Sequence, residues 1–196
     1  MSHTSTKHDS VSARRTYALL QKTLLDQLAS SPLERITLTD ICSASMVPRS
    51  TFYRYFEDKY DLLNYCLKSL IEEADLTEEA ICFKNMDSLW EFLIHLINHA
   101  DQNKILYRKI YMTNKDGELM HILRDSLIKI LSVMLHASED NILTRLKVSY
   151  PIFTMLLTDF YFSIIRCYLE LENDYDIKSF VDNVCLFANK DFFICD

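Results

Sequence analysis

Apolar residues recur at intervals of three and four along most of this chain, which is the spacing of one face of an α-helix. The first run begins at Ser12 and ends near Pro32, because proline disfavours helical geometry in the residue before it. Further amphipathic blocks follow at about 87–101, 103–112, 117–136, 142–170 and 177–194. The pattern predicts an all-α protein of about nine helices.

Composition supports the same fold class. The 196 residues include one glycine and three prolines, and 49% of them are apolar. Tight hairpins and phosphate-binding loops need glycine, so its scarcity disfavours most nucleotide-binding folds. No nucleophile–base pair or credible metal triad stands in a motif, so we expect neither an enzyme nor a bound cofactor.

Residues 37–63 predict a helix-turn-helix within this helical protein. Thr37 is a suitable N-cap with Asp40 three residues later, which is close to a capping box. The turn at 46–48 ends in Pro48, which is well placed to open the next helix. Asp58 or the preceding Glu57 can cap a fourth helix.

The second helix of this pair has two distinct faces. Phe52, Tyr55 and Phe56 fall on one face and would anchor it to the core. The opposite face carries guanidinium groups and hydroxyls, from Arg49, Ser50, Thr51, Tyr53 and Arg54. Arginine can pair with guanine, and hydroxyls can hold phosphates. The alternative is an ordinary surface helix with a solvated polar face.

Charge is divided unevenly along the chain. Residues 1–60 hold eight Lys or Arg and six Asp or Glu, whereas the remainder holds 13 basic and 22 acidic residues. A basic end on an acidic body fits contact with DNA at that end alone. We therefore expect the N-terminal part to bind DNA.

The stretch from about Ser12 to Ile71 resembles the DNA-binding head of the TetR (tetracycline repressor-like) family. ITLTDICSASMVPRSTFYRYFEDKYDLL follows the pattern I-T-x-x-x-I-A, a small residue and glycine, and then V-S-x-x-T-F-Y-x-Y-F-x-x-K-x-x-L. The core of that motif is intact as Thr51, Phe52, Tyr53, Tyr55, Phe56 and Lys59. The resemblance covers about a third of the chain.

The resemblance implies roles for individual residues. Bases would be contacted or flanked by Arg49, Ser50, Thr51 and Arg54. Phosphates would be held by Tyr53, Tyr55, Lys59 and the start of the second helix at Thr37 and Thr39. Three positions depart from the pattern: Cys42 replaces alanine, Met46 replaces the turn glycine, and Pro48 replaces a serine cap. Met46 must either avoid the left-handed conformation or be strained in it.

The resemblance also implies a division into a tail at 1–11, a helix-turn-helix domain at 12–60, and an effector-binding and dimerisation body at 61–196. The last two helices would pair with those of a second subunit. Both are apolar on more than one face, as a helix with two partners must be. The interface candidates are Phe160, Ile164, Cys167, Phe180, Val184 and Phe187.

The middle helices would hold an effector. The candidate pocket residues are Trp90, His95, Tyr107, Tyr111, Phe153 and Asp159, with plain core packing as the alternative for the aromatic ones. Asp159 lies on an apolar helix face, and a buried carboxylate needs a partner such as Arg166 or a cationic ligand. The alternative for Asp159 is an ordinary aspartate at an interface or on the surface. His95 and His99 have a metal-binding spacing, but no third ligand is near them in sequence, so no metal is expected.

Residues 1–12 are polar and contain no apolar signal-peptide core, so we expect a cytoplasmic protein whose six cysteines are reduced. We expect no membrane span either. The best apolar stretch, Tyr150–Leu169, is interrupted by Asp159 and Arg166.

The leading interpretation is a homodimeric repressor that is released from a palindromic operator, a double-stranded DNA site, by an effector. The alternative is a regulator whose body binds a partner protein rather than a small molecule and that acts as a co-activator. The stretches at 103–108 and 164–169 are similar to a branch of the family from low-GC Gram-positive bacteria, some of whose members have no known small-molecule ligand.

Overall fold

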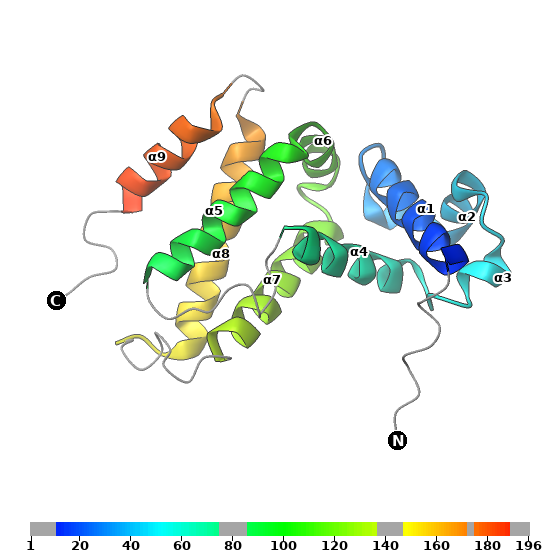
Figure 1. The fold of residues 1–196 in the computed structure, drawn as a ribbon, viewed down its shortest axis with the longest axis horizontal. Coiled ribbons are helices and arrows are strands. Elements are labelled where there is room, and N and C mark those ends of the chain that lie inside the picture. Colours follow the sequence, from blue (N-terminus) through cyan, green and yellow to red (C-terminus); the bar gives the residue numbers. More distant parts are fainter. Residues whose placement is uncertain (1–10, 75–85, 137–146, 172–174, 189–196) are drawn as a thin grey trace.

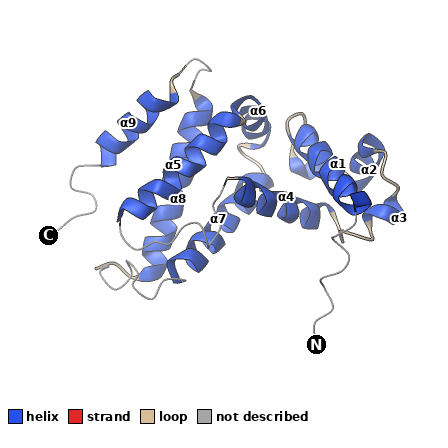
Figure 2. Cartoon of the chain, viewed as in Figure 1, coloured by secondary structure: helices blue, strands red, loops and turns tan. Residues whose placement is uncertain are grey.

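The computed structural model describes residues 11–74, 86–136, 147–171 and 175–188. Within these ranges the regular elements are all helices, as the apolar spacing predicts (Figure 2). Residues 1–10 of the tail predicted at 1–11 lie outside the described residues, as does the part of the last predicted helix beyond residue 188, whereas Val11 begins α1.

The helices of the head lie at one end of the molecule (Figure 1). They are α1 (Val11–Leu28), the short 3-10 helix η1 (Leu33–Arg35), α2 (Leu38–Ser45) and α3 (Arg49–Phe52). The helix α4 (Lys59–Glu73) leads from the head toward the rest of the chain.

The body consists of α5 (Met86–Gln102), α6 (Lys104–Asn114), α7 (Glu118–His136), α8 (Tyr150–Glu170) and α9 (Ile177–Ala188). The helix α9 runs beside α5 at the end of the molecule opposite α3 (Figure 1). Pro151 lies in the first turn of α8, where its missing N–H has no helical partner to lose. The predicted block at 142–170 therefore contains a helix start at Tyr150, and Pro151 does not kink it.

Local signals fix the helix ends in the head. Thr37 Oγ1 accepts from the Asp40 backbone N–H at 3.2 Å, and Asp40 Oδ2 accepts from the Thr37 backbone N–H at 2.9 Å. This completes the capping box that the sequence predicts. The side chain of Asp58 caps α4 by accepting from two backbone N–H groups, those of Tyr60 and Asp61. Asp58, rather than Glu57, is thus the cap.

Two apolar clusters hold the fold together. The body core contains Leu93, Leu131, Phe153 and Tyr161, among others. The head core joins α1, α2, α3 and α4, and it also includes Ile110 of α6 and Leu119 of α7. Two body helices therefore close the core of the head, and no described linker separates the two parts.

The helix α8 is long and apolar enough to cross a membrane by length and composition alone. The helix belongs to the body core, however, and packs against α5, α6 and α7. Core helices of this kind often pass the same test, so it is weak evidence for a span.

Met46 ends α2 in the left-handed conformation, with φ of 54°. This conformation costs a non-glycine residue about 1–2 kcal/mol relative to glycine. Glycine loses more chain entropy on folding, which partly offsets that difference. We expect Met46→Gly to raise the free energy of unfolding by up to about 1 kcal/mol. Met46→Ala is the control, since it keeps the Cβ atom and should leave stability nearly unchanged. Urea unfolding of both variants measures this, and equal stability of the two would contradict it.

Candidate nucleic-acid interface

The polar face of the helix-turn-helix is open to solvent. Arg49, Ser50, Tyr53 and Arg54 are exposed, whereas Phe52 of the same segment is fully buried. The Arg49 guanidinium donates to the hydroxyl of Thr39, which links the start of α3 to the start of α2. The sequence separates these two faces correctly, and the exposed face carries two cations.

The second helix of the pair is shorter than the stretch from Arg49 to Phe56 whose faces the sequence predicts. The α3 helix has four residues, and a turn follows it. Backbone N–H groups of Tyr55 and Phe56 still donate to the Phe52 carbonyl at 2.9 and 3.0 Å, so the chain keeps a helical course through the turn. Arg54 therefore stays on the exposed side although it lies outside the helix.

The aromatic residues after α3 pack into the head. The Tyr55 ring lies 5.0 Å from the Tyr17 ring of α1, and the Phe56 ring lies 5.4 Å from it. Arg54 lies over the Tyr55 ring at 5.7 Å, which limits where its guanidinium can go. Tyr55 is half-buried, so its ring supports the segment while part of the side chain remains exposed.

Lys59 has a role that the sequence analysis missed. Its ammonium group donates to the backbone carbonyls of Leu33 and Ile36 at 2.8 and 2.9 Å. The side chain thus braces the segment between α1 and α2, and two of its three donors are used inside the protein. Lys59 therefore has a structural role, and the phosphate contact predicted for it stays a prediction that only its remaining donor could make.

A buried amide joins the head to the body. Asn114, the last residue of α6, is 1% exposed. Its Oδ1 accepts from the Leu33 N–H at 2.9 Å, and its Nδ2 donates to the carbonyls of Leu28 and Ile110 at 2.8 and 2.9 Å. The side chain therefore ties the end of α1 and η1 to α6. We call this set of contacts the Asn114 joint.

The turn that follows Asn114 extends the joint. The Glu118 N–H donates to the Glu34 carboxylate, which lowers the pKa of Glu34, and the Tyr60 hydroxyl donates to Glu118 at 3.1 Å. A Cβ atom at Gly117 would lie 2.8 Å from Glu34 Oε1, so glycine lets the carboxylate approach the backbone. The sequence marks Asn114–Gly117 only as a turn, because nothing local shows that η1 packs on it.

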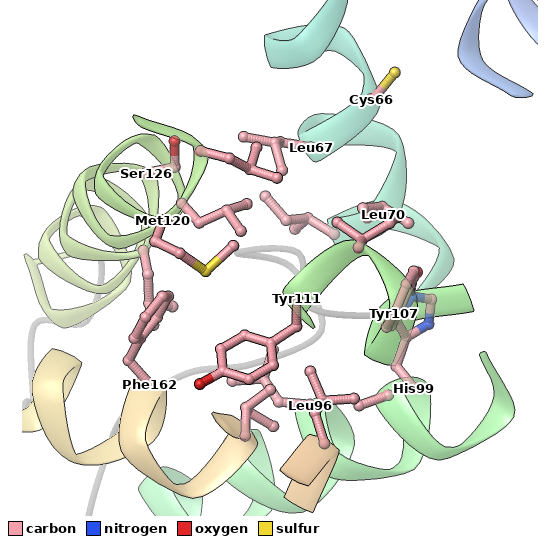
Figure 3. A pocket seen from close by; sticks show the side chains of 18 of the residues that line it. Cys66, Leu67, Leu70, Leu96, His99, Tyr107, Tyr111, Met120, Ser126 and Phe162 are labelled. Atoms are coloured by element: carbon pink, nitrogen blue, oxygen red, sulfur yellow. Dashed lines mark hydrogen bonds between the residues drawn. The ribbon is translucent and has the colours of Figure 1, made fainter. Parts of the chain in front are cut away.

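A cavity of about 270 Å³ lies between the head and the body. Its walls come from α1 and α4 on one side and from α5, α6, α7 and α8 on the other (Figure 3). Of the predicted pocket residues, Tyr107 and Tyr111 line it. His99, predicted only as a possible metal ligand, lines it too, and its Nε2 lies 2.8 Å from the Tyr107 hydroxyl.

The other four predicted pocket residues lie elsewhere. Trp90 packs edge-on against Phe160, with 6.1 Å between the ring centroids. Phe153 is part of the body core, and His95 is exposed. None of them lines this cavity. Helical spacing alone does not distinguish a cavity wall from a core face or an outer surface.

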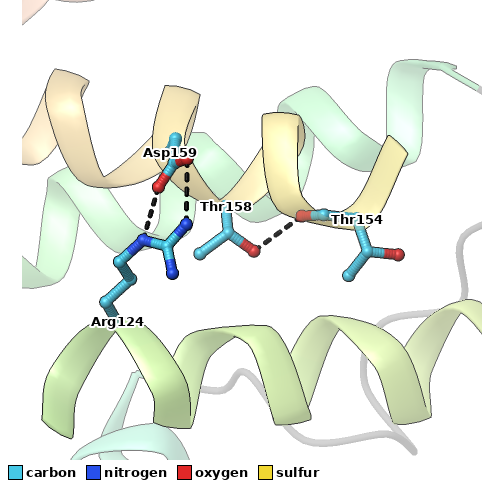
Figure 4. A network of polar contacts seen from close by, with 4 residues as sticks. All are labelled: Arg124, Thr154, Thr158 and Asp159. Carbon is cyan, nitrogen blue, oxygen red and sulfur yellow. Dashed lines mark hydrogen bonds and ion pairs between the residues drawn. The ribbon is translucent and has the colours of Figure 1, made fainter. Parts of the chain in front are cut away.

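Asp159 is an exposed residue rather than a buried pocket carboxylate. It accepts two hydrogen bonds from Arg124 of α7, with N–O distances of 2.6 and 3.0 Å (Figure 4). These bonds hold the pKa of Asp159 below its usual value. The partner is thus Arg124, not Arg166. With 52% of the Asp159 side chain exposed, the pair adds little to stability.

The predicted dimer residues occupy three environments. Ile164 and Phe180 belong to the core of their own chain, so they leave little surface for a second subunit. Phe160 and Val184 are half-buried against that core, whereas Cys167 and Phe187 are exposed. Other apolar residues are exposed on the same two helices: Ile152, Met155 and Leu156 of α8, and Leu186 of α9.

Two observations on the described residues concern metal binding and thiol chemistry. No group of three or more His, Cys, Asp or Glu residues there could hold a metal ion. The described cysteines are free, and burial raises the pKa of the Cys66 thiol to about 12. A thiol with so high a pKa is a poor nucleophile at neutral pH.

Comparison with known proteins places the sequence near transcriptional regulators. No family model matches the chain. A curated relative, the HTH-type dhaKLM operon transcriptional activator DhaS of Lactococcus lactis subsp. lactis (strain IL1403), is 30% identical over 105 residues. The match covers 53% of this chain and 52% of the relative, so the chain spans about half the length of the curated relative it matches.

One solved structure, the dihydroxyacetone kinase operon activator DhaS, aligns with 88% of this chain and 95% of its own. The TM-score is 0.49 and the sequence identity is 19%.

The Asn114 joint makes a prediction about stability. Asn114→Ala leaves the Leu33 N–H and the Leu28 carbonyl buried without their partner. We expect the free energy of unfolding to fall by about 2–4 kcal/mol. The control is Asn98→Ala, an exposed position on α5 that should change stability by less than about 0.5 kcal/mol. Chemical denaturation of the two variants measures the difference, and similar losses would show that the joint contributes little.

Proposed function

We propose that this protein is a sequence-specific DNA-binding regulator of transcription. The observation that carries the proposal is the exposed polar face of the helix-turn-helix, held on a fully buried Phe52. Two arginines and a set of hydroxyls on one surface suit the edges and phosphates of a major groove. The sequence similarity to a transcriptional activator supports the same class of function.

We further propose that it acts as a homodimer on a palindromic site. Exposed apolar residues on α8 and α9, including Leu156 at 62% and Phe187 at 68%, support this, because such surface is stabilised when a second subunit covers it. Two-fold symmetry would present two heads to two half-sites. Release of a repressor by an effector would use the cavity beside the head.

A second candidate is an activator whose body binds a partner protein. Two observations favour it. The curated relative is a transcriptional activator by its printed description. Exposed apolar residues lie on both α8 and α9, so one set could serve a dimer and the other a partner. The cavity favours a small-molecule effector instead.

Selection from a random duplex pool at near-physiological salt tests the proposed function. We expect the purified full-length protein to enrich a palindrome, whose sequence would then identify candidate regulated genes. Weak, salt-sensitive binding without enrichment would overturn specific binding by the protein alone. Restored enrichment with a partner protein present would then favour the second candidate.

Substitutions at Arg49 and Tyr53 should have different effects on the affinity for DNA and on the preference for its sequence. Arg49→Ala, at the start of α3, should weaken operator binding by about 1–3 kcal/mol and relax the preferred sequence at one position. Tyr53→Phe should weaken binding to all sequences alike if its hydroxyl holds a phosphate. Lys129→Ala, at an exposed position of α7 outside both the head and the proposed dimer helices, is the control and should bind as the wild type does. Fluorescence anisotropy measures each affinity, and unchanged binding by both head variants would contradict the proposed interface.

The apolar surface of the last two helices predicts the oligomeric state. Phe187→Glu and Leu156→Glu place a charge where a second subunit would cover it, and each should raise the dimer dissociation constant at least tenfold. Val133→Glu, at an exposed position of α7, should leave the dimer intact. Analytical ultracentrifugation measures the equilibrium. A monomeric wild-type protein, or dimers that tolerate both changes, would contradict the proposed interface.

A further inference from the structure

The walls of the cavity are almost entirely apolar. On the head side they come from α1 and α4, through Leu25, Leu28, Leu63 and Leu70. Further aliphatic and aromatic side chains close it from the body, among them Leu96, Ile110, Met120 and Phe162 (Figure 3). We propose that this cavity binds an uncharged, largely apolar small molecule that lies between the head and the body.

The polar groups in the walls are few, and apart from the half-buried Ser126 hydroxyl they have partners or are exposed. His99 and Tyr107 bond to each other at 2.8 Å. The Tyr111 hydroxyl donates to Glu170, an exposed residue, at 2.6 Å. Arg166 is exposed, so its guanidinium stays hydrated. A charged ligand would therefore lose its hydration without gaining a buried counter-charge, which is strongly unfavourable.

Burial also favours an uncharged wall. It lowers the pKa of His99, so the imidazole is neutral at physiological pH. An aliphatic or aromatic ligand that binds there therefore removes no water from a charged histidine. A single hydroxyl on that ligand could share the Tyr107 oxygen, which has acceptor capacity beyond its bond to His99.

The volume limits the size of the ligand. A cavity of about 150 Å³ lined by aliphatic and aromatic residues holds benzene, and the present cavity measures about 270 Å³. At the packing density of protein interiors, this corresponds to about a dozen non-hydrogen atoms. This is the part of a ligand that these walls can enclose.

An occupant would contact both sides of the Asn114 joint. Leu28 and Ile110, whose carbonyls accept from Asn114, both line the cavity. Leu119, which follows Glu118 of the same joint, lines it as well. A ligand that separates these side chains would shift α6 against α1 and so change how the head is held. This regulatory consequence rests on the proposed function, whereas ligand binding itself does not.

Isothermal titration of the full-length protein with three probes of nearly equal size tests the ligand class. The probes are 1-decanol, decanoate and decylammonium, all below their aggregation limits. We expect 1-decanol to bind stoichiometrically and both charged probes to bind at least tenfold more weakly. Equal affinity for all three, or no detectable binding of 1-decanol, would overturn the proposal.

Two variants test the location. Leu67→Trp and Leu96→Trp fill the cavity from α4 and from α5, on opposite walls (Figure 3). Each should weaken 1-decanol binding at least tenfold, and having two allows for one that fails to fold. Leu19→Trp is the matched control at an exposed position of α1 outside the cavity, and it should bind as the wild type does. Undiminished binding by the folded cavity variants would overturn the assignment.

A final measurement separates this inference from the proposed function. Operator affinity is measured with and without saturating 1-decanol, in the wild type and in the folded cavity variant. We expect at least a fivefold change in the wild type alone. If the duplex pool yields no enriched site, the proposed function fails while the titration still decides the ligand class. If an operator is bound but 1-decanol is not, the cavity proposal fails alone.

Discussion

The arrangement of the head on the body depends on one buried carboxamide. Asn114 bonds to the end of α1, to η1 and to its own helix, with all three contacts between 2.8 and 2.9 Å. Removing an amide from water is unfavourable unless its donors and acceptor are satisfied, so these partners must stay in place together. Because η1 leads directly into the Thr37 capping box, a fixed η1 also fixes where α2 and α3 begin.

The same region explains what the sequence could and could not predict. Helix ends in the head depend on neighbours in sequence, so Thr37, Asp40 and Asp58 reveal them directly. The joint depends on contacts between residues about 80 positions apart, for which a single sequence gives no local sign. Asn114 looks like an ordinary turn residue until η1 is placed against it.

The candidate sites divide along the same line. Amphipathicity separates exposed Arg49 and Arg54 from buried Phe52, because the chain keeps a helical course from α3 through the turn that follows it. Periodicity cannot decide between cavity wall, core and outer surface, since those depend on which helix packs opposite. Tyr107 therefore lines the cavity, Phe153 lies in the core, and Asp159 faces solvent beside Arg124, although all three were predicted for one pocket.

The Lys59 ammonium group donates hydrogen bonds to the Leu33 and Ile36 carbonyls. Phe52 and Phe56 are buried, and Tyr55 packs on Tyr17. Most residues of the T-F-Y-x-Y-F-x-x-K motif at 51–59 thus hold the fold of the head together. The exposed residues proposed to contact DNA, Arg49, Ser50, Tyr53 and Arg54, stand between these packed positions. Two proteins could share this signature and still regulate unrelated genes, because the signature identifies the fold of the head and not the DNA sequence that it binds.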